Sequence, residues 1–262
     1  MMRSGALIYI ASGLVFMAHM FYGISNVNAQ SYYIEGKITD QTTNEPIPFV
    51  NVFLNNTITG TTTDINGDYI LGNLDSGLYT LVISIIGHEV INKEIRLKDG
   101  KHLKLDFKLK ESVTNLSEVL FVGKEDKKWM KDFRRFKREF LGANSVTLKY
   151  EFVNPYVLEF YRDKKNKVFK ATANAPLEII NYGLGYKVYF FLRDFEQRSG
   201  SLRFYGQTRF EELAPADPRS TLEWAENRAN TYHGSLHHFF HALIENSIEE
   251  EEFMVYKVSG IH

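Results

Sequence analysis

The chain has 262 residues, of which 44% are hydrophobic and 14% aromatic, and its formal net charge at pH 7 is −1. This composition supplies enough apolar side chains for packed cores and excludes wholesale disorder. Because acidic and basic residues nearly balance and are interspersed along most of the chain, the sequence favours no nucleic-acid partner.

Residues 1–30 predict a secretory signal peptide. Arg3 precedes an apolar run over residues 6–21, and a polar segment follows. Val27 and Ala29 are small residues at the −3 and −1 positions of a cleavage site, so we expect cleavage after Ala29. An uncleaved membrane anchor is the alternative, although the run is shorter than the roughly 20 residues that a span needs.

The sequence contains no cysteine. An exported protein of this kind has no disulfides, so we expect each of its domains to depend on a hydrophobic core. It also has no cysteine that could carry a lipid anchor after the signal peptide.

Alternating apolar and polar residues predict several short strands between residues 31 and 110. Residues 103–109 alternate regularly and indicate one half-buried strand. Residues 79–86 are apolar on both faces, which predicts a central strand, and residues 50–54 predict a third. Short strands separated by frequent turns are typical of a β-sandwich.

The dipeptide Asn66-Gly67 predicts a hairpin with a type I′ turn, in which both central residues have positive φ. Asp64, Asn66 and Asp68 also allow a calcium loop as an alternative. However, Tyr69 stands at the sixth position of such a loop, where a glycine is needed, and the twelfth position holds aspartate instead of glutamate. We therefore prefer the turn.

These motifs, in their order along the chain, resemble the carboxypeptidase-like regulatory domain. The segments that carry the resemblance are Gly36-Lys-Ile-Thr-Asp, Pro46-Ile-Pro-Phe-Val-Asn-Val, Thr63-Asp-Ile-Asn-Gly-Asp-Tyr, Leu74, Gly77-Leu-Tyr and Ile86-Gly87. The resemblance implies a non-catalytic, transthyretin-like (prealbumin-like) antiparallel β-sandwich over residues 31–110. His88 stands where the family usually has tyrosine, and we expect this histidine to lie in an exposed loop.

Residues 111–143 are expected to form a linker and an amphipathic helix. The linker residues 116–123 resemble the segment that joins such a sandwich to the plug of TonB-dependent outer-membrane transporters. Residues 124–262 are too few for a plug and a barrel, so we do not expect a transporter.

A helix is predicted over residues 125–141, because aromatic and apolar residues recur there at three- and four-residue spacing. These residues are Trp129, Met130, Phe133, Phe136 and Phe140. Eight basic and four acidic residues lie between Lys124 and Glu139. We expect a solvated basic face over a core-facing aromatic stripe; peripheral contact with an anionic membrane surface and docking to a partner protein are the alternatives.

Residues 144–262 predict a second, α+β domain with an antiparallel sheet and helices near the C-terminus. Strands are predicted over residues 146–152, 157–161, 168–173, 186–192 and 202–210, with a hairpin at residues 163–166. Several motifs resemble the body of exported bacterial proteins that carry this sandwich without a barrel: Phe140-Leu-Gly, Asn154-Pro, Ala175-Pro-Leu, Leu184-Gly-Tyr, Tyr205-Gly, Phe210-Glu-Glu-Leu, Arg228 through Tyr232, Gly234, Ser235, His238 and Phe239. That resemblance implies no catalytic residue.

Two helices are predicted near the C-terminus. Ser220 and Glu223 have the spacing of a capping box, Gly234 is expected to end the first helix, and Ser235 to cap the second. An acidic turn over residues 249–252 should precede a last strand over residues 253–258.

The second helix places His237, His241 and Glu245 on one face, as zinc ligands would be. The residue after His237 is a histidine and not the glutamate of a metalloprotease motif, so packing, capping or interface roles are preferred for these histidines.

The sequence therefore predicts a non-catalytic binding or assembly protein without a cofactor. It would be exported to the periplasm or outer membrane of a Gram-negative bacterium. Its partner would be an envelope protein or a glycan. The alternatives are a metal-dependent hydrolase using His237, His241 and Glu245, and an accessory partner of an outer-membrane complex docked through residues 125–141.

Overall fold

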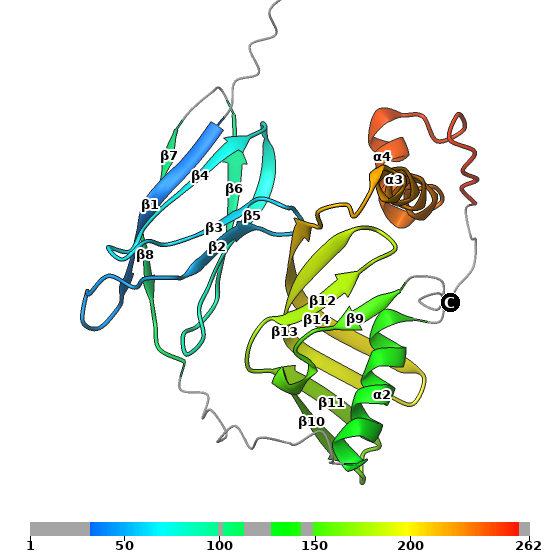
Figure 1. Cartoon of the computed structure of the whole chain (residues 1–262), viewed down its shortest axis with the longest axis horizontal. Helices are drawn as coiled ribbons and strands as arrows, with labels where there is room; N and C mark the ends of the chain where they lie inside the picture. The colour runs from blue at the N-terminus through cyan, green and yellow to red at the C-terminus, as the bar shows by residue number, and fades with distance from the viewer. Residues whose placement is uncertain (1–31, 99–101, 113–126, 143–148, 257–262) are drawn as a thin grey trace, which may run out of the picture.

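The computed structural model describes residues 32–98, 102–112, 127–142 and 149–256 (Figure 1). The predicted signal peptide with its cleavage site at Ala29 and the transporter-like segment 116–123 lie outside these ranges. Within them the chain is mainly β, with a sandwich first and an α+β domain after it, as the sequence predicted.

The first domain is a sandwich of two four-stranded sheets. One sheet consists of β4 (Asp68–Leu74), β1 (Tyr32–Asp40), β7 (Leu103–Lys104) and β8 (Phe107–Leu109). The other has the order β3 (Gly60–Thr62), β2 (Asn51–Leu54), β5 (Gly77–Ser84) and β6 (Ile91–Leu97). Fully buried Ile34, Val52 and Leu81 are among the side chains that fill the core between them. The central position predicted for the strand over residues 79–86 is confirmed, since β5 lies between β2 and β6.

The expected single strand over residues 103–109 is wrong in one respect: it is interrupted between β7 and β8. Both pieces pair in parallel with β1, and the gap lies beside Gly36. At the gap, the Asp106 carboxylate accepts the Lys37 N–H at 2.8 Å, and the Tyr69 hydroxyl donates to the Leu105 carbonyl at 2.8 Å. Side chains therefore replace the ladder bonds that the interruption removes.

The turn at Asn66-Gly67 is present, but the predicted type I′ hairpin is wrong. Gly67 has a φ of 77°, whereas Asn66 is not among the residues with positive φ. The Asp64 carboxylate accepts the N–H groups of Asn66 and Asp68 at 2.8 and 2.9 Å, which holds the turn. The strands on either side, β3 and β4, belong to different sheets, so the turn carries the chain across the sandwich.

His88 does not lie exposed in its loop, contrary to the expectation. Its side chain is 18% exposed, and its Nε2 lies 3.6 Å from Oδ2 of Asp40. An isolated β-bridge to Glu111 holds its backbone. The histidine is therefore packed at the end of the sandwich, where the chain leaves this domain.

The second domain is built on a six-stranded antiparallel sheet. Its strands are β9 (Tyr150–Phe152), β10 (Leu158–Asp163), β11 (Val168–Ala173), β12 (Leu177–Asn181), β13 (Tyr186–Arg198) and β14 (Ser201–Glu212). A short 3-10 helix, η2 (Pro155–Val157), precedes β10. The long strand β13 pairs with β14 along one edge, and with β12 and then β11 along the other. The hairpin predicted at residues 163–166 is confirmed; β12 was not predicted.

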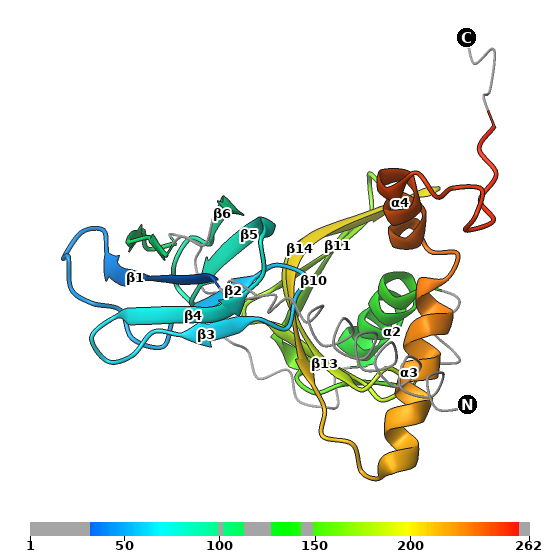
Figure 2. The ribbon, with the colours of Figure 1, turned by 90° about the horizontal axis from the view of Figure 1, so that it is seen from above.

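Helix α2 (Lys127–Leu141) covers one face of this sheet, and the sandwich lies against the other face (Figure 2). Phe136 is fully buried and contacts the rings of Phe160 and Phe195 on the sheet. The indole N–H of Trp129 donates to the Leu158 carbonyl at 3.1 Å. The expectation of a core-facing aromatic stripe is confirmed, and the sheet covers the apolar side of the helix.

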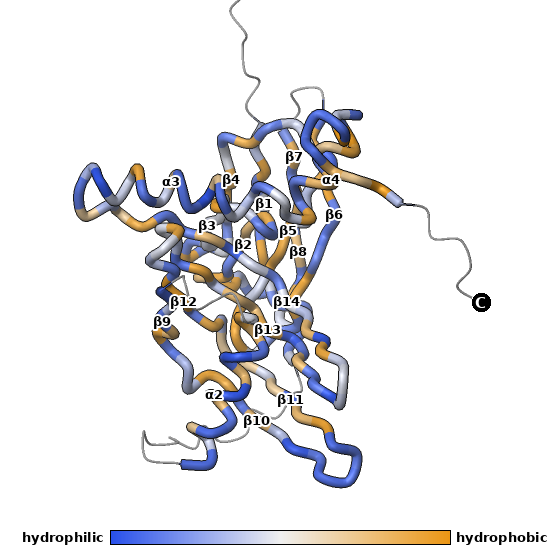
Figure 3. Tube along the Cα trace, turned by 90° about the vertical axis from the view of Figure 1, so that its right-hand side faces the viewer, coloured by the Kyte–Doolittle hydropathy of each residue, from blue (hydrophilic) through white to orange (hydrophobic). Residues whose placement is uncertain are grey.

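Two further helices follow the sheet: α3 (Pro218–Tyr232) and α4 (Leu236–Glu245). The predicted capping box at Ser220 is wrong, because Asp217 caps α3 and accepts the Ser220 N–H at 2.8 Å, with Pro218 in the first turn. Ser235 caps α4 as predicted. No strand forms over the described part of residues 253–258. Figure 3 shows that α3 is largely hydrophilic along its length.

Among the helices described here, none combines the length and apolar character needed to cross a membrane.

Candidate functional site

A short seam joins the two domains through the backbone. The segment after β2 runs beside β14: Asn56 N–H donates to the Thr208 carbonyl at 2.8 Å, and Phe210 N–H donates to the Thr57 carbonyl at 2.9 Å. The Asn55 side-chain oxygen accepts the Thr208 N–H at 2.8 Å. These bonds fix the register between segments that are about 150 residues apart in the sequence.

Apolar packing continues the seam. Phe53 of β2 and Phe191 of β13 stack with their ring centroids 4.8 Å apart. Together with Val82 of β5 they form a small buried cluster, which is separate from the two domain cores. Because Phe53 and Val82 point away from the sandwich core, their burial depends on the second domain.

Beside this seam lies a cleft of about 580 Å³ between the two domains. From the sandwich it is lined by Phe49, Ile86 and His88, among others, and from the second domain by Glu159, Asn174 and Arg193, among others. We call this space the interdomain cleft. Phe49 is 68% exposed and has a φ of 59°, so a non-glycine residue is held in a left-handed conformation with its ring open to solvent. An exposed ring beside amide and charged groups suits a ligand with both apolar and polar surfaces.

His88 lines the interdomain cleft, and Asp40 lies beside His88, with 3.6 Å between Oδ2 and Nε2. Hydrogen bonds from the Thr43 and Thr42 N–H groups hold the pKa of the Asp40 carboxyl below its usual value, so Asp40 is a carboxylate at neutral pH. The Nδ1 atom of His88 is buried, with no hydrogen-bond partner found for it in the described chain. This unpartnered nitrogen is enclosed by the protein, so it contributes no contact that a ligand in the interdomain cleft could reach.

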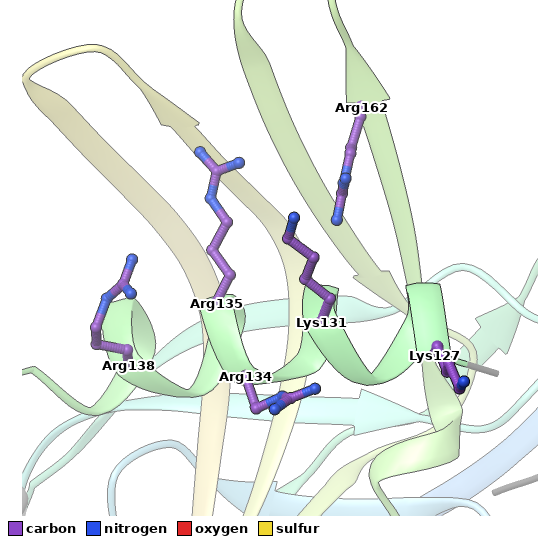
Figure 4. A pocket seen from close by; sticks show the side chains of 6 residues that line it. All are labelled: Lys127, Lys131, Arg134, Arg135, Arg138 and Arg162. Atoms are coloured by element: carbon purple, nitrogen blue, oxygen red, sulfur yellow. The ribbon is translucent and has the colours of Figure 1, made fainter. Parts of the chain in front are cut away.

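A second hollow lies on the opposite side of the sheet, along α2. It measures about 700 Å³, and we call it the basic hollow; it is lined by Lys127, Lys131, Arg134, Arg135, Arg138 and Arg162. Figure 4 shows Lys131, Arg135 and Arg138 extending to the same side of the helix as Arg162, which descends from β10. The helical spacing predicted the basic face of α2, but nothing in the sequence indicated that β10 would add Arg162.

Two of these cations are held by carboxylates. Arg162 Nε donates to Oδ1 of Asp132 at 2.6 Å, and Asp132 is 3% exposed. Arg138 donates to Oε1 of Glu139 at 2.7 Å from its Nη2, and this bond lowers the pKa of the Glu139 carboxyl. Arg135 instead bonds the side chain of Gln197 at 2.7 Å.

The three candidate zinc ligands lie on the exposed side of α4. His241 Nε2 lies 3.4 Å from Oε1 of Glu245, while the ring of His237 is 5.8 Å from that of Tyr232. Across the described ranges, no group of three or more histidine, cysteine, aspartate or glutamate residues is arranged to hold a metal ion. The metal-dependent hydrolase stays a hypothesis, and the placement of His237, His241 and Glu245 in the described structure does not support it.

His238 has a packing role. It is 6% exposed, its Nδ1 accepts the Gly234 N–H at 3.1 Å, and its Nε2 lies 2.9 Å from a carboxylate oxygen of Glu251. The acidic turn after α4 is thereby tied to the start of the helix. No sequence pattern indicates this pair, because it depends on the chain folding back after Asn246, which has a φ of 58°.

Comparison with known proteins bears on the first domain. Residues 34–121 match the family model of the CarboxypepD_reg-like domain. The chain therefore carries a domain of this family, as the motifs from Gly36 to Gly87 suggested. The matched range continues past the sandwich into the segment before α2.

One curated relative is the TonB-dependent receptor P39 of Formosa agariphila. It is 36% identical over 120 residues, which is 45% of this chain but 11% of the receptor. The chain thus corresponds to a small part of that receptor.

Solved structures resemble the chain only distantly. The Streptococcal ancillary pilin is 12% identical, with a TM-score of 0.28, over 69% of this chain and 59% of the pilin. A DUF3823 family protein from Bacteroides ovatus is 11% identical, with a TM-score of 0.23, over 70% of this chain and 82% of that protein. TM-scores this low establish no shared fold.

Proposed function

We propose that this chain is an exported, non-catalytic binding or assembly protein of the cell envelope of a Gram-negative bacterium. The observation that carries the proposal is the CarboxypepD_reg-like domain at residues 34–121. The partial similarity to a TonB-dependent receptor supports a place in the periplasm or at the outer membrane. The interdomain cleft is the surface that binds the partner.

The shape of the interdomain cleft supports binding. The seam at Asn56 and Thr57 and the stacked rings of Phe53 and Phe191 hold its two walls in a fixed relation. A preformed cleft binds at a smaller entropic cost than one that must be ordered first. Phe49 supplies an exposed apolar contact, and Asn174 and Arg193 supply polar groups, so the partner is a protein segment or a glycan with mixed surface.

A more specific form of this proposal makes the chain an accessory partner of an outer-membrane complex. The receptor similarity favours this form. The aromatic side of α2 is packed on its own sheet, so contact through this helix involves only its basic side.

Photo-cross-linking in cells tests the binding proposal. The full chain, carrying a C-terminal tag and a photo-reactive residue at position 174 in the interdomain cleft, is irradiated in its own bacterium, and the cells are fractionated. We expect the chain in the envelope fraction and a defined cross-linked species. Phe49→Asp should abolish this species, and Ile65→Asp, which changes an equally exposed apolar residue outside the interdomain cleft, should leave it.

Retention in the cytoplasm, or a cross-link that Phe49→Asp does not change, would contradict the proposal. So would a hydrolase or peptidase activity of the purified chain that one point substitution abolishes. Metal analysis separates the hydrolase alternative: stoichiometric zinc that is lost in both His237→Ala and His241→Ala would favour that enzyme.

A further inference from the structure

The basic hollow concentrates positive charge on a protein whose net charge is −1. Six cationic side chains line it, and within the described ranges the carboxylates bonded to them are those of Asp132 and Glu139. Six positive and two negative charges leave a local excess of four positive charges. The hairpin after Arg162 adds exposed Lys164, Lys165 and Lys167 beyond the end of β10.

Holding these cations together costs stability. Lys127 and Lys131, Lys131 and Arg135, and Arg134 and Arg138 are like-charged pairs at four-residue spacing, and such pairs destabilise a helix. The first turn of α2 contains no acidic residue, so Lys127 also faces the positive end of the helix dipole. A bound anion would relieve both costs.

Packing and ion pairs within the protein account for only some of the six cationic side chains that line the basic hollow. Arg162 satisfies buried Asp132, Arg135 lies 4.4 Å from the centroid of the Phe169 ring, and Arg138 bonds Glu139. In contrast, Lys127, Lys131 and Arg134 form no ion pair within the described ranges, and all three are exposed. Their charges remain available to a ligand.

The shape of the basic hollow favours a compact anion over the surface of a bilayer. The apolar side of α2 is buried on its own sheet, so this helix has no apolar face with which to enter a bilayer. The site is a hollow between a helix and a strand, with a volume of about 700 Å³, which fits a compact ligand.

We propose that the basic hollow binds a compact ligand that carries several phosphate groups. A phosphate group has about −1.5 to −2 charges at pH 7 and three acceptor oxygens, so two or three such groups match the local excess of four positive charges. Arginine guanidinium groups bind phosphate through paired hydrogen bonds, and lysines add compact charges. The inference does not depend on the interdomain cleft, which lies on the other side of the sheet.

Titration calorimetry with inositol hexakisphosphate tests this proposal on the purified full chain. We expect saturable binding that weakens as salt is raised, because exposed charges are screened. The triple variant Lys127→Gln, Lys131→Gln, Arg134→Gln should bind at least about tenfold more weakly, since charge-assisted bonds are lost. A matched triple variant on the sandwich, Lys93→Gln, Arg96→Gln, Lys104→Gln, removes the same charge from exposed positions and should bind like the wild type.

A parallel arm uses vesicles of phosphatidylcholine and cardiolipin, whose headgroup carries two phosphates, in a sedimentation assay. Vesicle binding that inositol hexakisphosphate displaces, and that the α2 triple variant loses, identifies a lipid headgroup as the source of phosphate. Binding of inositol hexakisphosphate alone identifies a free phosphorylated compound. The proposal is overturned if neither probe binds, or if the α2 and sandwich variants weaken binding equally.

Discussion

Gly36 of β1 lies where the segment between β7 and β8 comes too close for a side chain. A Cβ at this position would overlap the backbone carbonyl of Leu105, which cannot move without breaking its bond to the Tyr69 hydroxyl. Burial raises the pKa of that hydroxyl, so it stays a hydrogen-bond donor well above neutral pH. The glycine is thus required by the way β7 and β8 close the sheet.

Gly36→Ala is expected to lower the free energy of unfolding by about 2 kcal/mol or more, because overpacking displaces β7 from β1. Urea denaturation measures this change. Gly72→Ala is the matched control, since nothing lies within 4 Å of a Cβ there. Equal midpoints for the two variants would contradict this account.

Glu196 gives the second domain a sensitivity to acid. Its carboxylate bonds Arg198 at 2.6 Å and Lys170 at 3.0 Å, and these partners lower its pKa from 4.5 to about 2. Because the folded-state pKa lies below the unfolded value, the stabilisation is complete above pH 4.5 and is lost as the pH falls toward 2.

Glu196→Gln should therefore flatten the fall in stability between pH 4.5 and pH 2, the two limits set by these pKa values. Denaturation at a series of pH values measures the slope. Glu159→Gln, at an exposed position, should keep the wild-type slope. A wild-type slope in Glu196→Gln would show that other carboxylates govern the acid response.

At the scale of elements, α2 shows what periodicity can and cannot predict. Its aromatic spacing predicted both the helix and its core-facing side, because i, i+3 and i+4 positions share one face. The pair of Arg162 and Asp132 could not be predicted, since 30 residues separate them and only the register of β10 under the helix brings them together.

Phe136→Ala is expected to lower the free energy of unfolding by about 3–5 kcal/mol, because it empties a space enclosed by aromatic rings. Lys131→Ala, five residues earlier on the exposed side, should leave it unchanged or slightly higher, because this change removes two like-charge pairs and no packed side chain. Chemical denaturation followed by circular dichroism compares the two. Similar losses in both variants would mean that α2 does not pack as described.

The sequence predicts where the strands lie better than it predicts which strands pair. Alternation marked residues 103–109 as extended, yet gave no sign that they run parallel to β1, because alternation does not specify a partner. The type of the turn at Asn66-Gly67 was likewise missed, since the crossing between two sheets, and not a hairpin, determines it.

For the whole molecule, the seam determines whether the two domains behave as one body. No local pattern predicts that Phe53 stacks on Phe191, since the contact joins distant parts of the chain. For the same reason the interdomain cleft was not predicted: its walls come from both domains.

Phe191→Ala should uncouple the domains. Loss of the stacked ring weakens their contact, so we expect calorimetric unfolding to separate into two transitions, or existing transitions to move further apart. Tyr161→Ala, which removes an exposed ring from β10, serves as the control. An unchanged thermogram for Phe191→Ala would show that the backbone bonds at Thr57 and Phe210 suffice to couple the domains.

The parallel pairing of β1 with β8 has a mechanical consequence. The chain enters the sandwich at Tyr32 and leaves it after Leu109, at opposite ends of two strands that run side by side in the same direction. Tension between these two points pulls the strands past each other, so their hydrogen bonds share the load together instead of opening one by one. The sandwich is thus built to resist stretching between whatever holds its N-terminal side and the domain that follows it.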